Sequence, residues 1–169
     1  NDRVADAAPI ALRGGILELR GRAQAATTET MGAVALAQGA SFINSVAGGT
    51  GVNSADLSLG GLTRSANATV NFTAATAGQA GSSARIRFAS IGGVSTATAG
   101  GGLTNGILGG WATIGTSDFA TYIPGLGIAP LGAAGAPGYA AATTITALSQ
   151  PTDNIKLNTG ASSVANDLT

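Results

Sequence analysis

The sequence predicts an all-β chain whose strands wind repeatedly around one axis, as in a parallel β-helix. A triplet of an apolar residue, a small residue and leucine recurs at Ile10–Leu12, Val34–Leu36 and Leu57–Leu59. The leucines are 24 and 23 positions apart, a spacing typical of architectures in which each repeat packs on the next. Pairs of glycines punctuate the apolar segments, and Ser, Thr and Asn supply the residues of strands and turns.

Four segments alternate apolar and polar residues with the two-residue period of a half-buried strand. In residues 16–20 the two leucines share one side, while Glu18 and Arg20 share the other. The remaining segments are residues 70–73, 85–88 and 155–158.

Two segments are harder to assign. Residues 22–38 are Ala-rich, which favours a helix by propensity, but three threonines interrupt them and they end in the repeated triplet. We therefore expect a corner followed by a strand there. Residues 129–142, with two prolines and many small residues, predict an irregular loop. Ile86 lies 27 residues beyond Leu59, so later layers are expected to carry insertions.

A β-sandwich is the alternative fold. It needs hairpins with Asn-Gly or Asp-Gly turns every 8–12 residues or so. The only such dipeptide is Asn105-Gly106, and clear alternating strands do not flank it. The triplet spacing therefore favours stacked layers, formed by residues 1–169 as one segment.

Composition excludes several classes of function. Charged residues make up 9% of the chain, the net charge is zero and the basic residues are scattered, so no nucleic-acid partner is expected. No apolar run approaches the roughly 18 residues of a membrane-spanning helix, so no transmembrane segment is expected. Cys and His are absent, which excludes disulfides, thiolate metal sites and His-based catalytic triads. We expect no catalytic, cofactor or metal site.

The best enzymatic alternative is a pair of carboxylates brought together on neighbouring layers, as a glycosidase requires. Glu29 and Asp56 are 27 positions apart, close to one repeat. Lone solvated charges in turns are far commoner, so two unrelated surface residues are the favoured interpretation.

Aromatic and glycine residues offer weaker candidates for binding. Trp111, Tyr122 and Tyr139 could each stack on a sugar ring, although a place in the core or over it is favoured for Trp111. For the two tyrosines the alternatives are evenly balanced. The glycines at 100–102 lack the Lys-Ser/Thr that completes a phosphate-binding loop, so a flexible connection is favoured.

One block of residues resembles a known family. Residues 103–113, which include Gly-Gly-Trp-Ala-Thr, and residues 118–122, Asp-Phe-Ala-Thr-Tyr, look like a signature of the autotransporter-associated β-strand repeat proteins. The resemblance implies large bacterial surface proteins that carry several such units in tandem on a right-handed parallel β-helix, with structural or adhesive roles. Similarity to flanking parts of the same unit extends over residues 1–19, 61–64, 68–72 and 152–155.

These observations together predict a non-enzymatic structural protein of the bacterial cell surface. We expect a stiff rod, an excerpt or repeating unit of a longer protein, that stacks end to end or in tandem into a fibre or surface layer. Neither end carries an amphipathic helix or a charged plug, so both ends are expected to be open to self-association or to neighbouring repeats. Surface glycans or a surrounding matrix are the expected adhesive partners, and no pocket is expected. A carbohydrate-binding or carbohydrate-cleaving β-helix is the alternative.

Overall fold

The computed structural model describes residues 3–51, 53–80, 83–116, 118–140 and 150–156. Within these residues the chain forms twelve β-strands and no helix, which confirms the all-β prediction. The strands are β1 (Ile10–Arg13), β2 (Ile16–Arg20), β3 (Ala26–Met31), β4 (Val34–Gln38), β5 (Ala40–Val46), β6 (Ser54–Arg64), β7 (Thr69–Ala74), β8 (Ala84–Ile91), β9 (Val94–Ser95), β10 (Ala112–Ile114), β11 (Asp118–Ile123) and β12 (Gly127–Pro130).

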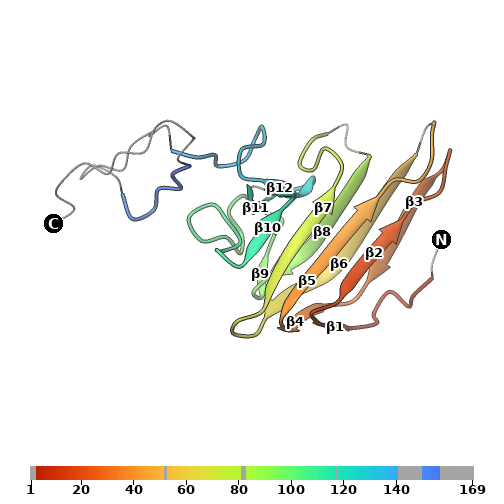
Figure 1. Ribbon diagram of the computed structural model, residues 1–169, viewed down its shortest axis with the longest axis horizontal. Helices are drawn as coiled ribbons and strands as arrows, with labels where there is room; N and C mark the ends of the chain where they lie inside the picture. Colours follow the sequence, from red (N-terminus) through yellow and green to blue (C-terminus); the bar gives the residue numbers. More distant parts are fainter. Residues whose placement is uncertain (1–2, 52, 81–82, 117, 141–149, 157–169) are drawn as a thin grey trace.

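The strands form two mixed sheets. The first sheet has the order β1-β4-β6-β8-β9, with β3 also paired to β6, and the second has the order β12-β11-β10-β7-β5-β2. Figure 1 shows the long strands side by side and oblique, with the N-terminal strands on one flank and β10–β12 on the other. The stretch expected to be a corner and one strand, residues 22–38, instead contains the two strands β3 and β4.

Successive turns of the chain lie on one another in parallel. From the first layer to the second, β1 pairs with β4, β2 with β5 and β3 with the first half of β6. From the second layer to the third, β4 pairs with the second half of β6, β5 with β7 and the first half of β6 with the first half of β8. The step is 24 residues where Ile10 pairs with Val34, and 29 where Ala55 pairs with Ala84. Of the ten strand pairings that the described residues form, seven are parallel.

The first two repeated triplets pair as predicted, because Leu12 lies opposite Leu36. The third assignment is wrong. Val34 pairs with Leu62, whereas Leu59 belongs to another row, opposite Met31 and Phe88. The step grows in stages. It is 24 residues at Ile10 and 26 at Ile16, and residues 47–53, two more than residues 21–25, raise it to 28 at Ala26.

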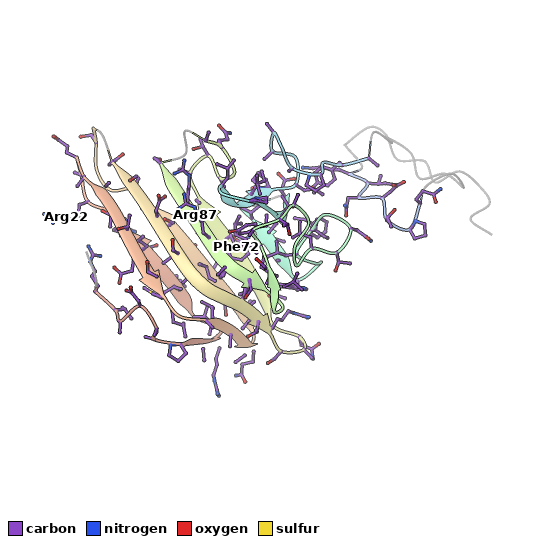
Figure 2. The ribbon with its side chains drawn as sticks, turned by 180° about the vertical axis from the view of Figure 1, so that it is seen from behind. Arg22, Phe72 and Arg87 are labelled. Atoms are coloured by element: carbon purple, nitrogen blue, oxygen red, sulfur yellow. The ribbon has the colours of Figure 1, made fainter. Side chains whose placement is uncertain are left out.

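The core lies inside these layers and consists of rows of apolar side chains. The predicted alternation is confirmed in β2, β7 and β8, where inward residues are wholly or largely buried. The rings of Phe72 and Phe88 meet edge to face, with centroids 6.1 Å apart (Figure 2 labels Phe72). Each such buried side chain contributes roughly 1.5–3 kcal/mol of burial free energy.

Two expected elements differ in the structure. The loop placed at residues 129–142 begins later, because residues 127–130 form β12; its last two residues lie outside the described part. The fourth alternating segment is not a strand where it is described: Ile155 and Lys156 belong to neither sheet, and the rest of that segment lies outside the described part.

After β8 the chain adds antiparallel pairings, while β10 still pairs in parallel with β7. Strand β9 turns back antiparallel on β8, and β10, β11 and β12 are joined by antiparallel pairings. The Tyr122 hydroxyl accepts a hydrogen bond from the backbone N–H of Phe88 (3.3 Å) and donates one to its carbonyl (3.0 Å). These contacts cover part of the outer edge of β8, while β12 has no partner strand on its outer side among the described residues. A cap made of hairpins and one buried tyrosine carries neither of the signals sought in the sequence, a helix or a charged plug.

Candidate functional site

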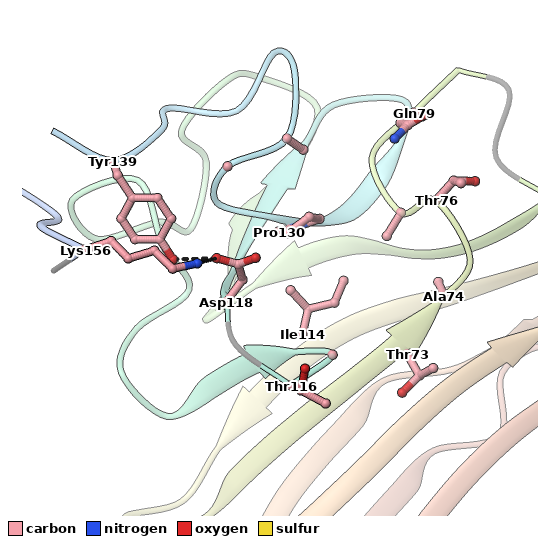
Figure 3. Close-up of a pocket in the computed structure, with 14 residues that line it drawn as sticks. Thr73, Ala74, Thr76, Gln79, Ile114, Thr116, Asp118, Pro130, Tyr139 and Lys156 are labelled. Atoms are coloured by element: carbon pink, nitrogen blue, oxygen red, sulfur yellow. Dashed lines mark hydrogen bonds and ion pairs between the residues drawn. The ribbon is translucent and has the colours of Figure 1, made fainter. Parts of the chain in front are cut away.

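A hollow of about 610 Å³ lies where the ends of β7 and β10 face the segment that follows β12 (Figure 3). This volume is in the range usual for small-molecule sites, about 300–1,000 Å³. The expectation of a molecule without a pocket is therefore wrong. Its lining combines short apolar side chains with polar ones, among them Thr73, Gln79, Thr116 and Asp118.

Asp118 is the centre of the polar side of this hollow. It is the first residue of β11, directly after the turn that follows β10. Its Oδ1 accepts hydrogen bonds from the Tyr139 hydroxyl (2.8 Å) and from the Lys156 ammonium (3.0 Å). Figure 3 shows the two partners together on one side of Asp118, with Ile114 and Pro130 among the other labelled lining residues. Two segments far along the chain are thereby tied to β11.

These contacts fix the charge state of the cluster. The hydrogen bonds from Tyr139 and Lys156 lower the pKa of Asp118 below its usual value of 3.8. Burial, and then the hydrogen bond to Asp118, raise the pKa of Tyr139 above its usual value of 10.0. At neutral pH the carboxylate is ionised, the phenol is protonated, and the Lys156 ammonium lies 5.2 Å from the centre of the Tyr139 ring. The cluster is electrically balanced.

This chemistry suits binding better than proton transfer. A general base or acid works best with a pKa near the operating pH, and both shifts here move away from neutrality. Asp118 is also the one carboxylate lining the hollow among the residues described. The described residues contain no group of three or more His, Cys, Asp or Glu side chains that could hold a metal ion.

A second, smaller hollow of about 180 Å³ opens beside the first and shares Gly115, Thr116 and Asp118 with it. Its other lining residues, Asn71, Thr113 and Phe119, come from β7, β10 and β11. The Asn71 amide nitrogen donates to Thr113 Oγ1 (2.8 Å) and to the carbonyl of Gly115 (2.8 Å), which holds that side chain in one orientation.

The structure separates the two carboxylates considered as a glycosidase pair. Glu29 lies on the inner face of β3 and is 3% exposed, whereas Asp56 is on the outer face of β6. The Glu29 carboxylate accepts hydrogen bonds from the backbone N–H groups of Arg3 and Val4, at 3.0 and 2.9 Å. Opposite faces of one sheet cannot supply a paired-carboxylate site.

The outer-face carboxylate of Asp56 is held by the chain's own cations. Its Oδ2 lies 3.7 Å from a guanidinium nitrogen of Arg85 and 3.5 Å from one of Arg87, a residue labelled in Figure 2. This part of the outer face is occupied by intramolecular ion pairs.

The three aromatic candidates have different environments. Trp111 is half-buried against the core with the Arg64 guanidinium 5.4 Å from its ring centre, which agrees with a place over the core. Tyr122 is buried in the cap described above. Tyr139 lines the hollow beside Asp118, whereas Tyr122 lines a separate hollow of about 440 Å³ next to residues of β3, β6 and β8. The glycines at 100–102 lie in turns, two of them with positive φ.

Sequence reasoning missed Asp118 and Lys156, and also Asn71, Thr113 and Phe119. No local pattern marks them, because Tyr139 and Lys156 are 21 and 38 residues from Asp118. Asn71 and Thr113 become neighbours only through the pairing of β7 with β10.

Comparison with known proteins yields no match to a protein family, a curated protein or a solved structure. In the described part of the chain, no helix has the length and apolar character needed to cross a membrane.

Proposed function

We propose that this chain is a non-enzymatic structural protein of the bacterial cell surface, folded as a short right-handed parallel β-helix that receives further layers at one end. The main support is the parallel stacking of its layers, with one end capped and the other end carrying unpaired strand edges. Right-handed connection is the strong rule for parallel strands joined by crossovers. The resemblance to autotransporter-associated repeat proteins supports the same role and an extracellular location.

The open end is the outer edge of the first layer. Within the described part of the chain, β1 pairs with β4 alone, β2 with β5 alone and β3 with β6 alone. A strand edge without a partner presents N–H and C=O groups to which another strand can add. Residues 3–8 lie against β3, where Arg3 and Val4 donate to Glu29 and Gly32 donates to the Ala8 carbonyl. The edges of β1 and β2 are therefore the ones that the first layer offers to a neighbouring repeat or to a second copy.

The capped end modifies the expected mode of assembly. Because Tyr122 and the antiparallel strands occupy the other end, growth from copy to copy in a head-to-tail fibre is disfavoured. We propose instead that the open edge takes one further unit. Two copies can each be the further unit of the other, by joining their first layers around a twofold axis.

Strand β2 provides a selective test. On either side of β2, the Gly15 carbonyl and the Gly21 N–H form hydrogen bonds with β5. Alternate residues of a strand direct their backbone groups to opposite neighbours, so odd-numbered residues here face β5 and the N–H of Glu18 faces the open edge. Proline at position 18 removes this donor and leaves the ladder to β5 intact, as at natural edge strands. Glu18→Ala is the matched control, because it removes the same side chain and keeps the N–H.

The measurement is sedimentation equilibrium over a concentration series. We expect the parent chain and Glu18→Ala to associate reversibly, and Glu18→Pro to associate at least tenfold more weakly with an unchanged far-UV circular dichroism spectrum. A parent chain that stays monomeric at millimolar concentration would contradict self-association, and equal association of both variants would place the contact elsewhere.

A further inference from the structure

Exposed apolar side chains are concentrated in one row on the outer face of the second sheet. In the strand register, Ile16 of β2 lies opposite Phe42 of β5, and Phe42 lies opposite Asn71 of β7. Asn71 pairs with Thr113 of β10, which pairs with Phe119 of β11. Directly paired residues share a face, so these five side chains form one line across five strands.

The composition of this line, which we call the outer row, is unusual for a solvated sheet face. Ile16, Phe42 and Phe119 are 67%, 43% and 39% exposed and are three of the five large apolar side chains exposed in the described part of the chain. The two rings flank the polar Asn71–Thr113 pair. Phe42 and Phe119 are three strand spacings apart, or about 14 Å.

The polar centre of the outer row is preorganised for hydrogen bonding. Since both amide hydrogens of Asn71 are directed to Thr113 Oγ1 and the Gly115 carbonyl, its Oδ1 is set as an acceptor. The Thr113 oxygen accepts from Asn71, so its own hydrogen is available to donate. An acceptor and a donor thus stand side by side at the smaller hollow, whose wall includes the Phe119 ring.

Charge selects against an ionic ligand. Asp118, the carboxylate lining the smaller hollow, is neutralised by Lys156 at 3.0 Å. The five residues of the outer row are themselves uncharged. A ligand with apolar faces and many hydroxyl groups, but without net charge, matches this surface.

We infer that the outer row binds a neutral oligosaccharide lying across the strands. The C–H faces of two of its sugar rings pack on Phe42 and Phe119, and hydroxyl groups between them donate to Asn71 Oδ1 and accept from Thr113. Aromatic faces give such contacts with little loss of side-chain entropy, and polar groups fixed in advance reduce the cost of binding. The inference does not depend on assembly at the first layer, since the outer row is complete within one chain.

The test is a titration of the full chain by isothermal calorimetry with neutral pentasaccharides of β-1,4-glucose, β-1,4-N-acetylglucosamine, α-1,4-glucose, β-1,4-mannose and β-1,4-galactose. Phe42→Ala and Phe119→Ala each remove one platform. Val94→Ala is the matched control, because it removes an exposed apolar side chain, 54% exposed, from the first sheet. Thr113→Val keeps the side-chain shape and removes the donor.

We expect saturable binding of at least one pentasaccharide, weakened about tenfold by either Phe substitution and by Thr113→Val, and unchanged by Val94→Ala. Absence of binding by the parent chain to all five at millimolar concentration would overturn the inference. So would binding that neither Phe substitution weakens. A change in sedimentation of Phe42→Ala or Phe119→Ala without any change in sugar affinity would assign the outer row to contact between copies instead.

Discussion

The capping tyrosine allows a quantitative test of how the layered stack ends. Tyr122→Phe removes one hydroxyl and keeps the ring, so packing is retained while both hydrogen bonds to Phe88 are lost. The Phe88 carbonyl keeps another donor, the Thr96 hydroxyl, but its N–H loses the partner supplied by Tyr122. Removing one partner and leaving a buried backbone donor unpaired costs about 1–3 kcal/mol.

Urea unfolding at neutral pH measures this cost. We expect Tyr122→Phe to lower the free energy of unfolding by about 1–3 kcal/mol with an unchanged m-value, which corresponds to a fall in Tm of roughly 2–12 °C for a chain of this size. Tyr139→Phe is the control, because it also removes one phenol hydroxyl but from the rim of the hollow. Equal stability of Tyr122→Phe and the parent chain would refute the assignment of this hydroxyl as the cap of β8.

Two further predictions concern the charged groups that tie loops to the strands. The pKa of Asp118 is lowered in the folded state, so its contribution to stability is present above about pH 4 and is lost as the pH falls through the folded value. The pKa of Tyr139 is raised, so its contribution is present below about pH 10 and is lost at higher pH. We expect the Tm of Asp118→Asn to fall less steeply than that of the parent chain at both ends of this pH range. Identical profiles of Tm against pH would argue against the cluster. Glu29→Ala removes the acceptor for the backbone N–H groups of Arg3 and Val4. We expect it to lower the free energy of unfolding by about 1–3 kcal/mol and to speed amide exchange at those two residues. Glu29→Gln keeps one side-chain oxygen and is expected to have a smaller effect. Unchanged exchange in Glu29→Ala would contradict the contact.

Local pattern was sufficient to predict which residues form several of the strands. In β2, β7 and β8 the side chains alternate between core and solvent, and the sequence carries that period directly. The pairing of Leu12 with Leu36 was also predictable, because the first layer has the length that the triplets suggest.

Register beyond the first step was not predictable from the same pattern. Leu59 and Leu62 could each take a place in an apolar row. Which of them lies over the first triplets depends on the step between layers, which grows from 24 residues at Ile10 to 28 at Ala26. The single Asn-Gly dipeptide shows the limit of turn signals: Thr104 and Ile107 do exchange two backbone hydrogen bonds around it, yet the hairpin stands outside both sheets. The candidate sites were missed for the same reason, since Asn71 meets Thr113, and Asp118 meets Lys156, only once the strands are in register.

The direction of the outer row connects the proposed assembly with the proposed binding. The row runs from strand to strand, along the direction in which layers are added, and Ile16 at its end belongs to β2 at the open edge. A unit that pairs with β2 places a new outward side chain beside Ile16 and extends the row. The capped end has the opposite effect, because β11 continues into β12 and the row stops at Phe119. Under both proposals together, this surface has a fixed terminus at Phe119 and a length that depends on how many layers are joined.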